Sequence, residues 1–362
     1  MSNVIRVLHT EWSNGWGGQE MRIIAEMLEI RSQNIEVFLA CRNQSYIKKK
    51  ALENNIKVFI LPFRGNFDFQ TLFALKKIIN KHSIDIVNTH SGKDTWVGGL
   101  AAKMARKKFI RTRHLSNPIS TSPLNFINRL ADYIITTGES VRSTMIKINH
   151  IKPNKIQSIP TGIDPSLYNP NIYNLKECRG KFDFADNEIV IGILAVLRQF
   201  KRHDLFLEMA KDLIKLYPNK KLLFIIAGDG PQKNNIQKKS YDLKINSNVR
   251  VLGHTNNVPE FLMAIDILVL SSDSKEGVPQ SVMQGLFMNK PIVATSSGST
   301  KDLLTEDSFK LVNTEDTEAL VKGVSYYLDG NSSQSSREYM INFFSKNNMI
   351  DKILRVYELI LQ

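Results

Sequence analysis

The stretch IVIGILAVLRQFKRHDLFLEMAK, residues 189–211, holds a strand, a turn and a helix in succession. Residues 189–196 are apolar and rich in β-branched side chains, which favours a buried strand. From residue 203 onward, apolar side chains recur at the spacing of one helix face. Because two parallel strands need such a crossover between them, the stretch predicts one strand–helix unit of a parallel sheet.

The same alternation runs through the chain in two sets, separated by a polar stretch near residues 165–187. The strand-like runs are 4–10, 35–41, 57–62, 84–90, 109–114, 133–138 and 156–162, then 189–196, 221–228, 248–254, 267–272, 291–295 and 309–312. We therefore predict an α/β protein with two Rossmann-like, doubly wound parallel-sheet domains facing a cleft. The predicted domains are residues 1–168 and 169–345, followed by a C-terminal helix at 346–362.

Size and composition narrow the class of protein. A chain of 362 residues is too long for one ordinary core and suits two domains. The N-terminal run resembles a strand rather than a signal peptide, and the longest apolar run, residues 189–197, is far shorter than the roughly 20 residues of a membrane helix. The two cysteines form neither a disulfide framework nor a metal-ligand pattern. These features predict a cytoplasmic protein.

The net charge of +13 is concentrated in the first half of the chain. Residues 1–165 contain 24 Lys and Arg against 12 Asp and Glu, with clusters at 46–50 and 103–114. Such a surface attracts anionic partners such as membranes, nucleic acid or acidic substrates, or it is simply a solvated face. The sequence has no zinc finger and no aromatic RNA-binding motif, so nucleic acid is not expected as a partner.

Ligands of open α/β sheets bind beyond the carboxyl ends of the strands, so the residues that follow each strand are candidates for the site. After residue 197 come Arg198, Lys201 and Arg202, three cations at the start of a helix. Cations are unfavourable at that end of a helix dipole unless an anion binds there, and an Arg fork with a Lys charge suits a phosphate. The pair Gly17-Gly18, which opens another helix, is a weaker signal of the same kind.

The stretch SKEGVPQSVMQG, residues 274–285, places a carboxylate in a turn beyond a buried strand. Glu276 can accept hydrogen bonds from the hydroxyl groups of a sugar, and the following amides can line a helix N-terminus that binds phosphate. Gln284 lies about one helical turn further on and can donate and accept. A diphosphate flanked by two polyols describes a nucleotide sugar.

The chain as a whole resembles the family 4 retaining glycosyltransferases of the GT-B fold. The matching segments are WGGQE, IPTGID (159–164), LRQFKRHD, AGDGP, VRVLGH and EGVPQSVMQG followed by KPIVAT, which together cover nearly the whole length. The chain is also similar to bacterial enzymes that build lipopolysaccharide core and other surface glycans. The resemblance implies transfer of a hexose from UDP-hexose or GDP-mannose to a saccharide or glycolipid, with no cofactor and no metal. It also implies that the last helix, near residues 349–362, returns to the first domain.

The resemblance assigns roles residue by residue. It makes Glu276, His114, Arg198 and Lys201 the catalytic group, with Glu276 on the donor-sugar hydroxyls and the two cations on the diphosphate. Further donor contacts are expected from Gly17, Gly18, Gly253, Gly277, Val278, Pro279, Gln280 and Gln284. Acceptor contacts are expected from His90, Asp94 and Arg113. Gln284 departs from the family pattern, which has a second glutamate there against the ribose.

Other functions stay open at this point. An epimerase or hydrolase of nucleotide sugars could use the same two domains, and product analysis would separate it from a transferase. A non-catalytic relative that binds nucleotides or carbohydrates is a further alternative, suggested by Gln284. The basic half of the chain predicts a peripheral association with the anionic inner face of the cytoplasmic membrane. The sequence gives no indication of the oligomeric state.

Overall fold

The computed structural model describes residues 4–114, 119, 126–273, 276–303, 305 and 308–362. The chain divides into two compact units, of which unit 1 comprises Met1–Gly162 and Asn347–Gln362, and unit 2 comprises Ile163–Lys346. The sequence predicted the first boundary after residue 168. The observed division falls earlier because Ile163 and Tyr168 pack into the core of unit 2.

Unit 1 is built on a seven-stranded parallel sheet in the order β3-β2-β1-β4-β5-β6-β7. The strands are β1 (Ile5–Glu11), β2 (Ile35–Cys41), β3 (Lys57–Ile60), β4 (Ile86–Thr89), β5 (Lys108–Arg113), β6 (Tyr133–Thr136) and β7 (Ile156–Ser158). One face packs against α1 (Gly18–Arg31), α2 (Tyr46–Glu53) and α14 (Lys346–Leu361). The other face packs against α3 (Phe69–Lys81), α4 (Gly92–Met104), α5 (Ile127–Leu130) and α6 (Glu139–Lys147).

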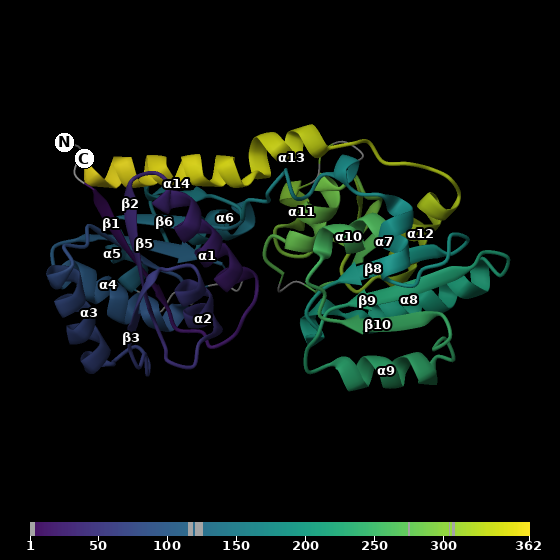
Figure 1. The fold of residues 1–362 in the computed structure, drawn as a ribbon, viewed down its shortest axis with the longest axis horizontal. Helices are drawn as coiled ribbons and strands as arrows, with labels where there is room; N and C mark the ends of the chain where they lie inside the picture. The colour runs from purple at the N-terminus through teal and green to yellow at the C-terminus, as the bar shows by residue number, and fades with distance from the viewer. Residues whose placement is uncertain (1–3, 115–118, 120–125, 274–275, 304, 306–307) are drawn as a thin grey trace. The chain divides into compact units, whose positions relative to one another are not determined.

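The C-terminal helix α14 joins the core of unit 1 although it is last in the sequence. Ile350, Ile353, Val356 and Tyr357 are buried in the same cluster as Ile23 of α1. Figure 1 shows this helix, in yellow, alongside the strands of unit 1. The apolar spacing of its inner face follows the 3.6-residue period of a helix.

Unit 2 is built on a six-stranded parallel sheet in the order β10-β9-β8-β11-β12-β13. The strands are β8 (Ile189–Leu194), β9 (Leu222–Ala227), β10 (Val249–Gly253), β11 (Ile267–Leu270), β12 (Ile292–Thr295) and β13 (Lys310–Val312). One face packs against α8 (His203–Leu216), α9 (Lys233–Asp242) and α12 (Thr317–Leu328). The other packs against α7 (Leu175–Lys181), α10 (Val258–Ala264), α11 (Gln280–Phe287) and α13 (Arg337–Phe344).

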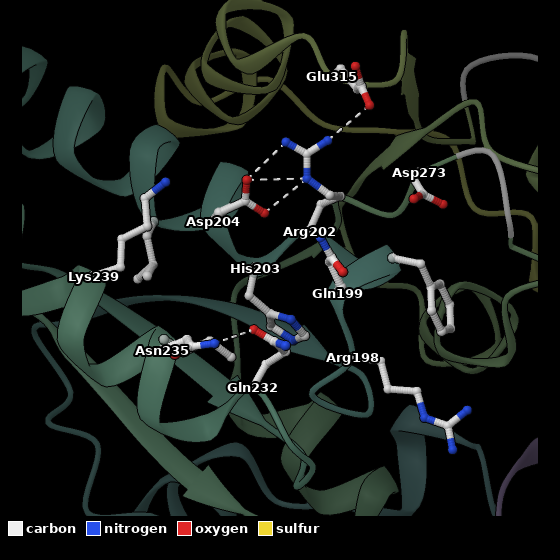
Figure 2. Close-up of a pocket in the computed structure, with 13 residues that line it drawn as sticks. Arg198, Gln199, Arg202, His203, Asp204, Gln232, Asn235, Lys239, Asp273 and Glu315 are labelled. Atoms are coloured by element: carbon white, nitrogen blue, oxygen red, sulfur yellow. Dashed lines mark hydrogen bonds and ion pairs between the residues drawn. The ribbon is translucent and has the colours of Figure 1, made fainter.

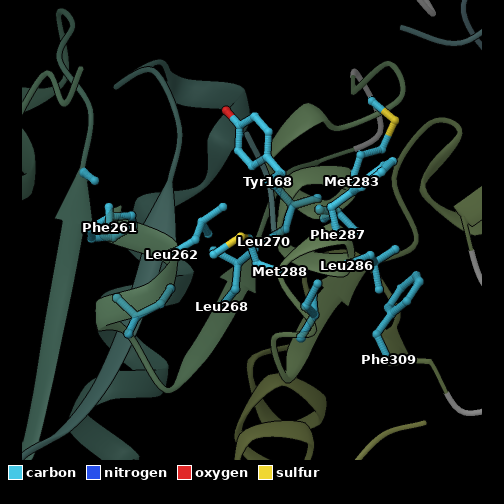
Figure 3. Packing of buried hydrophobic residues seen from close by; sticks show 14 of the residues in the cluster. Tyr168, Phe261, Leu262, Leu268, Leu270, Met283, Leu286, Phe287, Met288 and Phe309 are labelled. Atoms are coloured by element: carbon cyan, nitrogen blue, oxygen red, sulfur yellow. The ribbon is translucent and has the colours of Figure 1, made fainter. Parts of the chain in front are cut away.

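The core of unit 2 fills the space between β11 and the helices on the α11 face. Figure 3 shows Leu268 and Leu270 of β11 among Leu286, Phe287 and Met288, all of which are buried. Covering both faces of a parallel sheet explains why its strands are continuous apolar runs. The predicted doubly wound parallel sheets are therefore confirmed in both units.

The two sheets share a topology that places a binding edge in each. In unit 1 the strand order reverses between β1 and β4, and in unit 2 it reverses between β8 and β11. Loops that leave neighbouring strands at such a point run to opposite faces and open a crevice at the carboxyl edge. Within the described residues, no helix is long and apolar enough to cross a lipid bilayer.

Candidate active site

Lys201 and Glu276 form an ion pair at the switch point of unit 2. Lys201 is the last residue of the short helix η4 (Gln199–Lys201), which follows β8, and Glu276 follows β11. The Lys201 ammonium donates to the Glu276 carboxylate, and the Ser272 hydroxyl donates to the same carboxylate oxygen at 2.7 Å. The two charged side chains are only 12% and 11% exposed. Removing either one would leave the other as a buried, uncompensated charge, which is costly.

The backbone around this ion pair is held by contacts between the β8 and β11 loops. The Ser271 hydroxyl contacts the carbonyl oxygens of Lys201 and Arg202 at 3.0 and 2.9 Å, and the Asp273 amide donates to the Phe200 carbonyl at 2.8 Å. Gly298 has a φ of +53°, and a Cβ there would lie 1.7 Å from the Glu276 carbonyl oxygen. Only glycine fits at this position, because the loop after β12 packs directly on the Glu276 turn.

The predicted phosphate-binding groups lie beside the ion pair. Arg198 is exposed and immediately precedes η4. The Glu276 turn continues through Gly277 and Val278 to Pro279, which caps the N-terminus of α11 at Gln280. An exposed guanidinium, a neighbouring ammonium and a helix N-terminus together provide a site that suits an anion.

Gln284 lies one turn into α11, where its amide nitrogen donates to the Tyr168 hydroxyl at 2.8 Å. This bond uses the donor side of the amide and leaves the carbonyl oxygen as the group that can accept from a ligand. Gly253 ends β10 with a φ of +78°, and its carbonyl accepts from the Gly228 amide at 2.8 Å. The loop at Gly253 therefore needs glycine for its left-handed backbone.

A pocket of about 500 Å³ lies between η4, the start of α8 and α9. Figure 2 shows Arg202 at its upper side between Asp204 and Glu315, whose carboxylates lie 2.9 and 3.1 Å from the guanidinium. Burial lowers the pKa of His203, another lining residue, to about 4. Of the predicted site residues, Arg198 lines this pocket, whereas Glu276 and Gln284 do not. The pocket thus adjoins the ion pair on the α8 side of the sheet.

In unit 1, Asp94 and His90 are engaged within the protein. The Asp94 carboxylate accepts hydrogen bonds from the Thr10 hydroxyl at 2.6 Å, from the amides of His90 and Ser91 at 2.9 and 2.8 Å, and from the Ser91 hydroxyl. It is completely buried and caps the N-terminus of α4. His90 has both ring nitrogens bonded to other histidines, as described below. These hydrogen bonds of two of the three predicted acceptor residues hold the β4 loop in place.

The Gly17-Gly18 turn is also held from within. The Gly17 amide donates to the Glu20 carboxylate at 2.9 Å, so this amide is not directed at a ligand. Gly18 is the first residue of α1. The loop before them is fixed by Glu11, whose carboxylate accepts from the Ser13 amide at 2.6 Å and from the Gln19 side chain at 2.5 Å.

Sequence reasoning missed Glu11, Arg111 and His9, all of which lie in strands of unit 1 and are buried. Burial, together with the neighbouring charge of Asp94, raises the pKa of Glu11 to about 8. Arg111 donates to the Ser91 carbonyl and lies near Asp94. A charged residue inside a strand indicates a buried polar site only if both faces of that strand are known to be covered, which the sequence alone does not show.

Arg113 and His114 stand at the end of β5, next to the end of β4. Burial lowers the pKa of Arg113 to about 10, which keeps the guanidinium charged at neutral pH. His114 is half-buried, and its ring contacts the ring of His90. The structure thus brings His90, Asp94, Arg113 and His114 to one edge of the unit 1 sheet.

Two family models match the chain. Residues 16–167 match the model described as Glycosyltransferase Family 4, and residues 176–345 match the model described as Glycosyl transferases group 1. The chain is a glycosyltransferase. It belongs to the family that these two models describe, as its sequence motifs predicted.

Relatives and solved structures agree with this family. The chain is 25% identical to the UDP-Gal:alpha-D-GlcNAc-diphosphoundecaprenol alpha-1,3-galactosyltransferase of Escherichia coli, over 98% of this chain and 96% of that protein. A glycosyltransferase structure from Rickettsia africae aligns with a TM-score of 0.90 at 20% identity, covering 99% of both chains. Anabaena HepE in complex with UDP and glucose aligns with a TM-score of 0.83 at 17% identity, covering 98% of this chain and 99% of that one. The fold is GT-B.

Proposed function

We propose that this chain is a retaining hexosyltransferase that takes its sugar from a nucleoside diphosphate, with UDP-hexose as the donor. The observation that carries the proposal is the buried Lys201–Glu276 pair at the switch point of unit 2, beside exposed Arg198 and the N-terminus of α11. One end of this arrangement suits a diphosphate, and the other suits sugar hydroxyls. The name of the Escherichia coli relative and the HepE complexes with UDP and UDP-glucose support uridine as the base.

In the proposed reaction, Arg198, Lys201 and the amides that begin α11 stabilise the negative charge that develops on the leaving diphosphate. The bond between the anomeric carbon and the phosphate oxygen breaks, and the acceptor hydroxyl oxygen bonds to the same face of that carbon. The hydroxyl proton passes to the departing phosphate oxygen, so no covalent enzyme intermediate forms. Because Arg198 and Lys201 supply positive charge at the diphosphate, we also propose that the reaction needs no metal ion.

We propose a lipid-linked saccharide as the acceptor, in the synthesis of a bacterial surface glycan. The printed name of the Escherichia coli relative describes transfer to a sugar on a diphosphoundecaprenol, and this supports the choice. Two properties of unit 1 support a peripheral position on an anionic membrane. Its net charge is strongly positive, and Phe67, Phe69 and Phe73 are 73%, 64% and 58% exposed.

The decisive experiment has two stages. Thermal unfolding with a panel of nucleotides should show a larger upward shift with UDP than with GDP, ADP or CMP, because specific binding stabilises the folded state. Radiolabelled UDP-galactose and UDP-glucose are then incubated with lipid-linked N-acetylglucosamine, with and without EDTA. Transfer that resists EDTA is expected. A preference for GDP would contradict the donor, metal-dependent transfer would contradict the leaving-group chemistry, and release of free sugar without transfer would indicate a hydrolase.

A further inference from the structure

Three histidines of unit 1 lie in a hydrogen-bonded line across neighbouring strands. His9 lies within β1, His90 directly follows β4, and His114 directly follows β5. Nδ1 of His9 is 2.9 Å from Nε2 of His90, and Nδ1 of His90 is 3.0 Å from Nε2 of His114. The first two rings are tilted by only 8° with centroids 5.2 Å apart, so they meet edge to edge through their nitrogens.

All three rings are neutral at physiological pH. His9 and His90 are 0% and 1% exposed, and burial lowers the pKa of His9 to about 3. Burial also lowers the pKa of His90 and of His114 well below the usual value, and the nearby guanidinium groups of Arg22 and Arg111 add to this effect. Each ring therefore carries one N–H and one lone pair.

Neutrality leaves only two ways to make both hydrogen bonds. His90 must donate from one nitrogen and accept at the other, so its tautomer dictates those of both neighbours. In one arrangement all three protons are on Nδ1. His114 then has an N–H on Nδ1, the ring nitrogen that makes no hydrogen bond to another histidine. In the other, all three protons are on Nε2, and Nδ1 of His114 has a lone pair and could act as a base.

The buried end of the line favours the first arrangement. Nε2 of His9 is buried and has no hydrogen-bond partner within the described residues. The second arrangement would leave an N–H unpaired there, whereas the first leaves a lone pair. Orphaned buried N–H groups are rarer than under-satisfied acceptors because an unpaired donor is costly.

We propose that His9 and His90 are positioning residues that hold the proton of His114 on Nδ1, so that His114 presents a hydrogen-bond donor, and not a base, to a sugar bound at the carboxyl edge of the unit 1 sheet. The identity of that ligand rests on the proposed function, whereas the tautomers do not. The chain of histidines thus sets the chemical role of a residue at the edge of the sheet from inside the core.

Long-range ¹H–¹⁵N correlation spectra of the full-length protein test the proposal, since they report which ring nitrogen carries the proton. The seven histidines are assigned by single substitution. In the wild type, His9, His90 and His114 should all carry the proton on Nδ1. His9→Leu should convert His114 to a mixture of tautomers, whereas His9→Asn, whose amide can donate from the same place as Nδ1, should preserve it. His82→Leu, in the same unit but outside the line, should change nothing.

Kinetics with the sugar donor give a second measurement. His9→Leu should lower kcat/KM roughly fivefold, the effect of one neutral hydrogen bond, and His9→Asn should restore it, while the affinity for UDP stays unchanged. A wild-type spectrum with the His114 proton on Nε2 overturns the proposal, as does an unchanged His114 tautomer in folded His9→Leu. If the protein proves not to transfer sugars, the tautomers still test the positioning role of His9 and His90. If His9→Leu does not fold, the wild-type spectrum alone tests it.

Discussion

Glu276 is both the partner of Lys201 and the expected acceptor for a donor-sugar hydroxyl. Glu276→Ala removes the hydroxyl contact and also frees the Lys201 ammonium, which can then bind phosphate more strongly. We expect the transfer rate to fall by about 10- to 100-fold, as for a lost hydrogen bond to a charged group, while the affinity for UDP stays equal or rises. Isothermal titration with UDP and initial rates measure the two effects separately.

The matched control is Glu315→Ala, which removes a carboxylate paired with Arg202 on the surface. It should alter neither quantity by more than about twofold, since exposed ion pairs contribute little. A parallel loss of UDP binding and transfer in Glu276→Ala would show that the carboxylate serves the nucleotide, and the assignment to the sugar would fail.

Gln284 offers a test of what the missing carboxylate does. In Gln284→Glu the Tyr168 hydroxyl, now an acceptor from the amide, can turn to donate to the carboxylate, and the other carboxylate oxygen can accept from the ribose. A charged acceptor strengthens such a bond by about 1 kcal/mol, so UDP should bind roughly fivefold more tightly. Titration with UDP measures this, with Tyr168→Phe as the control for the loss of the hydroxyl. Weaker binding in Gln284→Glu would place the ribose elsewhere.

At the scale of the elements, sequence patterns predicted the strands well, but they did not predict the buried polar contacts inside unit 1. Each predicted apolar run overlaps a strand of the structure, because strands covered on both faces must be apolar. His9 escaped notice because it lies inside such a run, and Glu11 because it directly follows one. Periodicity does not reveal which polar side chains will meet across a sheet. Gly17 was expected to present its amide to a ligand, but the pairing with Glu20 depends on the path of the loop.

His9 in β1, together with His90 and His114 at the ends of β4 and β5, makes unit 1 sensitive to acid. The folded-state pKa of each ring lies below its usual value near 6.5, so below that pH the unfolded chain binds protons that the folded chain does not. Each histidine therefore lowers stability as the pH falls, by about 1.4 kcal/mol per pH unit. Glu11 and Glu26 act oppositely, since their pKa values are raised to about 8 and 7 and stability falls as pH rises from about 4.5.

The difference between two proteins isolates the histidine contribution. All three tryptophans, Trp12, Trp16 and Trp96, lie in unit 1, so their fluorescence follows the urea unfolding of that unit. Between pH 6.5 and 5, the free energy of unfolding should fall less steeply for His9→Leu than for the wild type. The surface variant His150→Asn should match the wild type. Equal slopes in all three proteins would mean that His9 titrates normally in the folded state.

At the scale of the whole molecule, the structure changes which surface of unit 1 is expected to bind an anionic membrane. The predicted basic clusters are partly neutralised, because Lys103 pairs with Asp132, Lys107 with Asp85, and Lys50 with Glu53. Helix α3 differs. Phe69, Phe73 and Lys77 follow each other at four-residue spacing on its exposed side, and neither Lys77 nor Lys81 has an ion pair with a described residue. Exposed aromatic rings beside unpaired lysines are typical of a surface that enters a membrane interface.

Helix α3 therefore carries the membrane prediction. Wild-type protein should sediment with vesicles that contain anionic lipid and less so with neutral ones, and the binding should weaken as salt rises. Phe69→Ser with Phe73→Ser should reduce binding by about 100-fold or more, because burying each phenylalanine contributes on the order of 1.5–3 kcal/mol. Lys77→Glu with Lys81→Glu should reduce it only at low salt. Tyr241→Ser, which removes a comparably exposed ring from α9 of unit 2, is the matched control and should bind normally. If the phenylalanine variant binds like the wild type, or if the wild type binds neither kind of vesicle at low salt, α3 is only a solvated surface and the proposed membrane association fails.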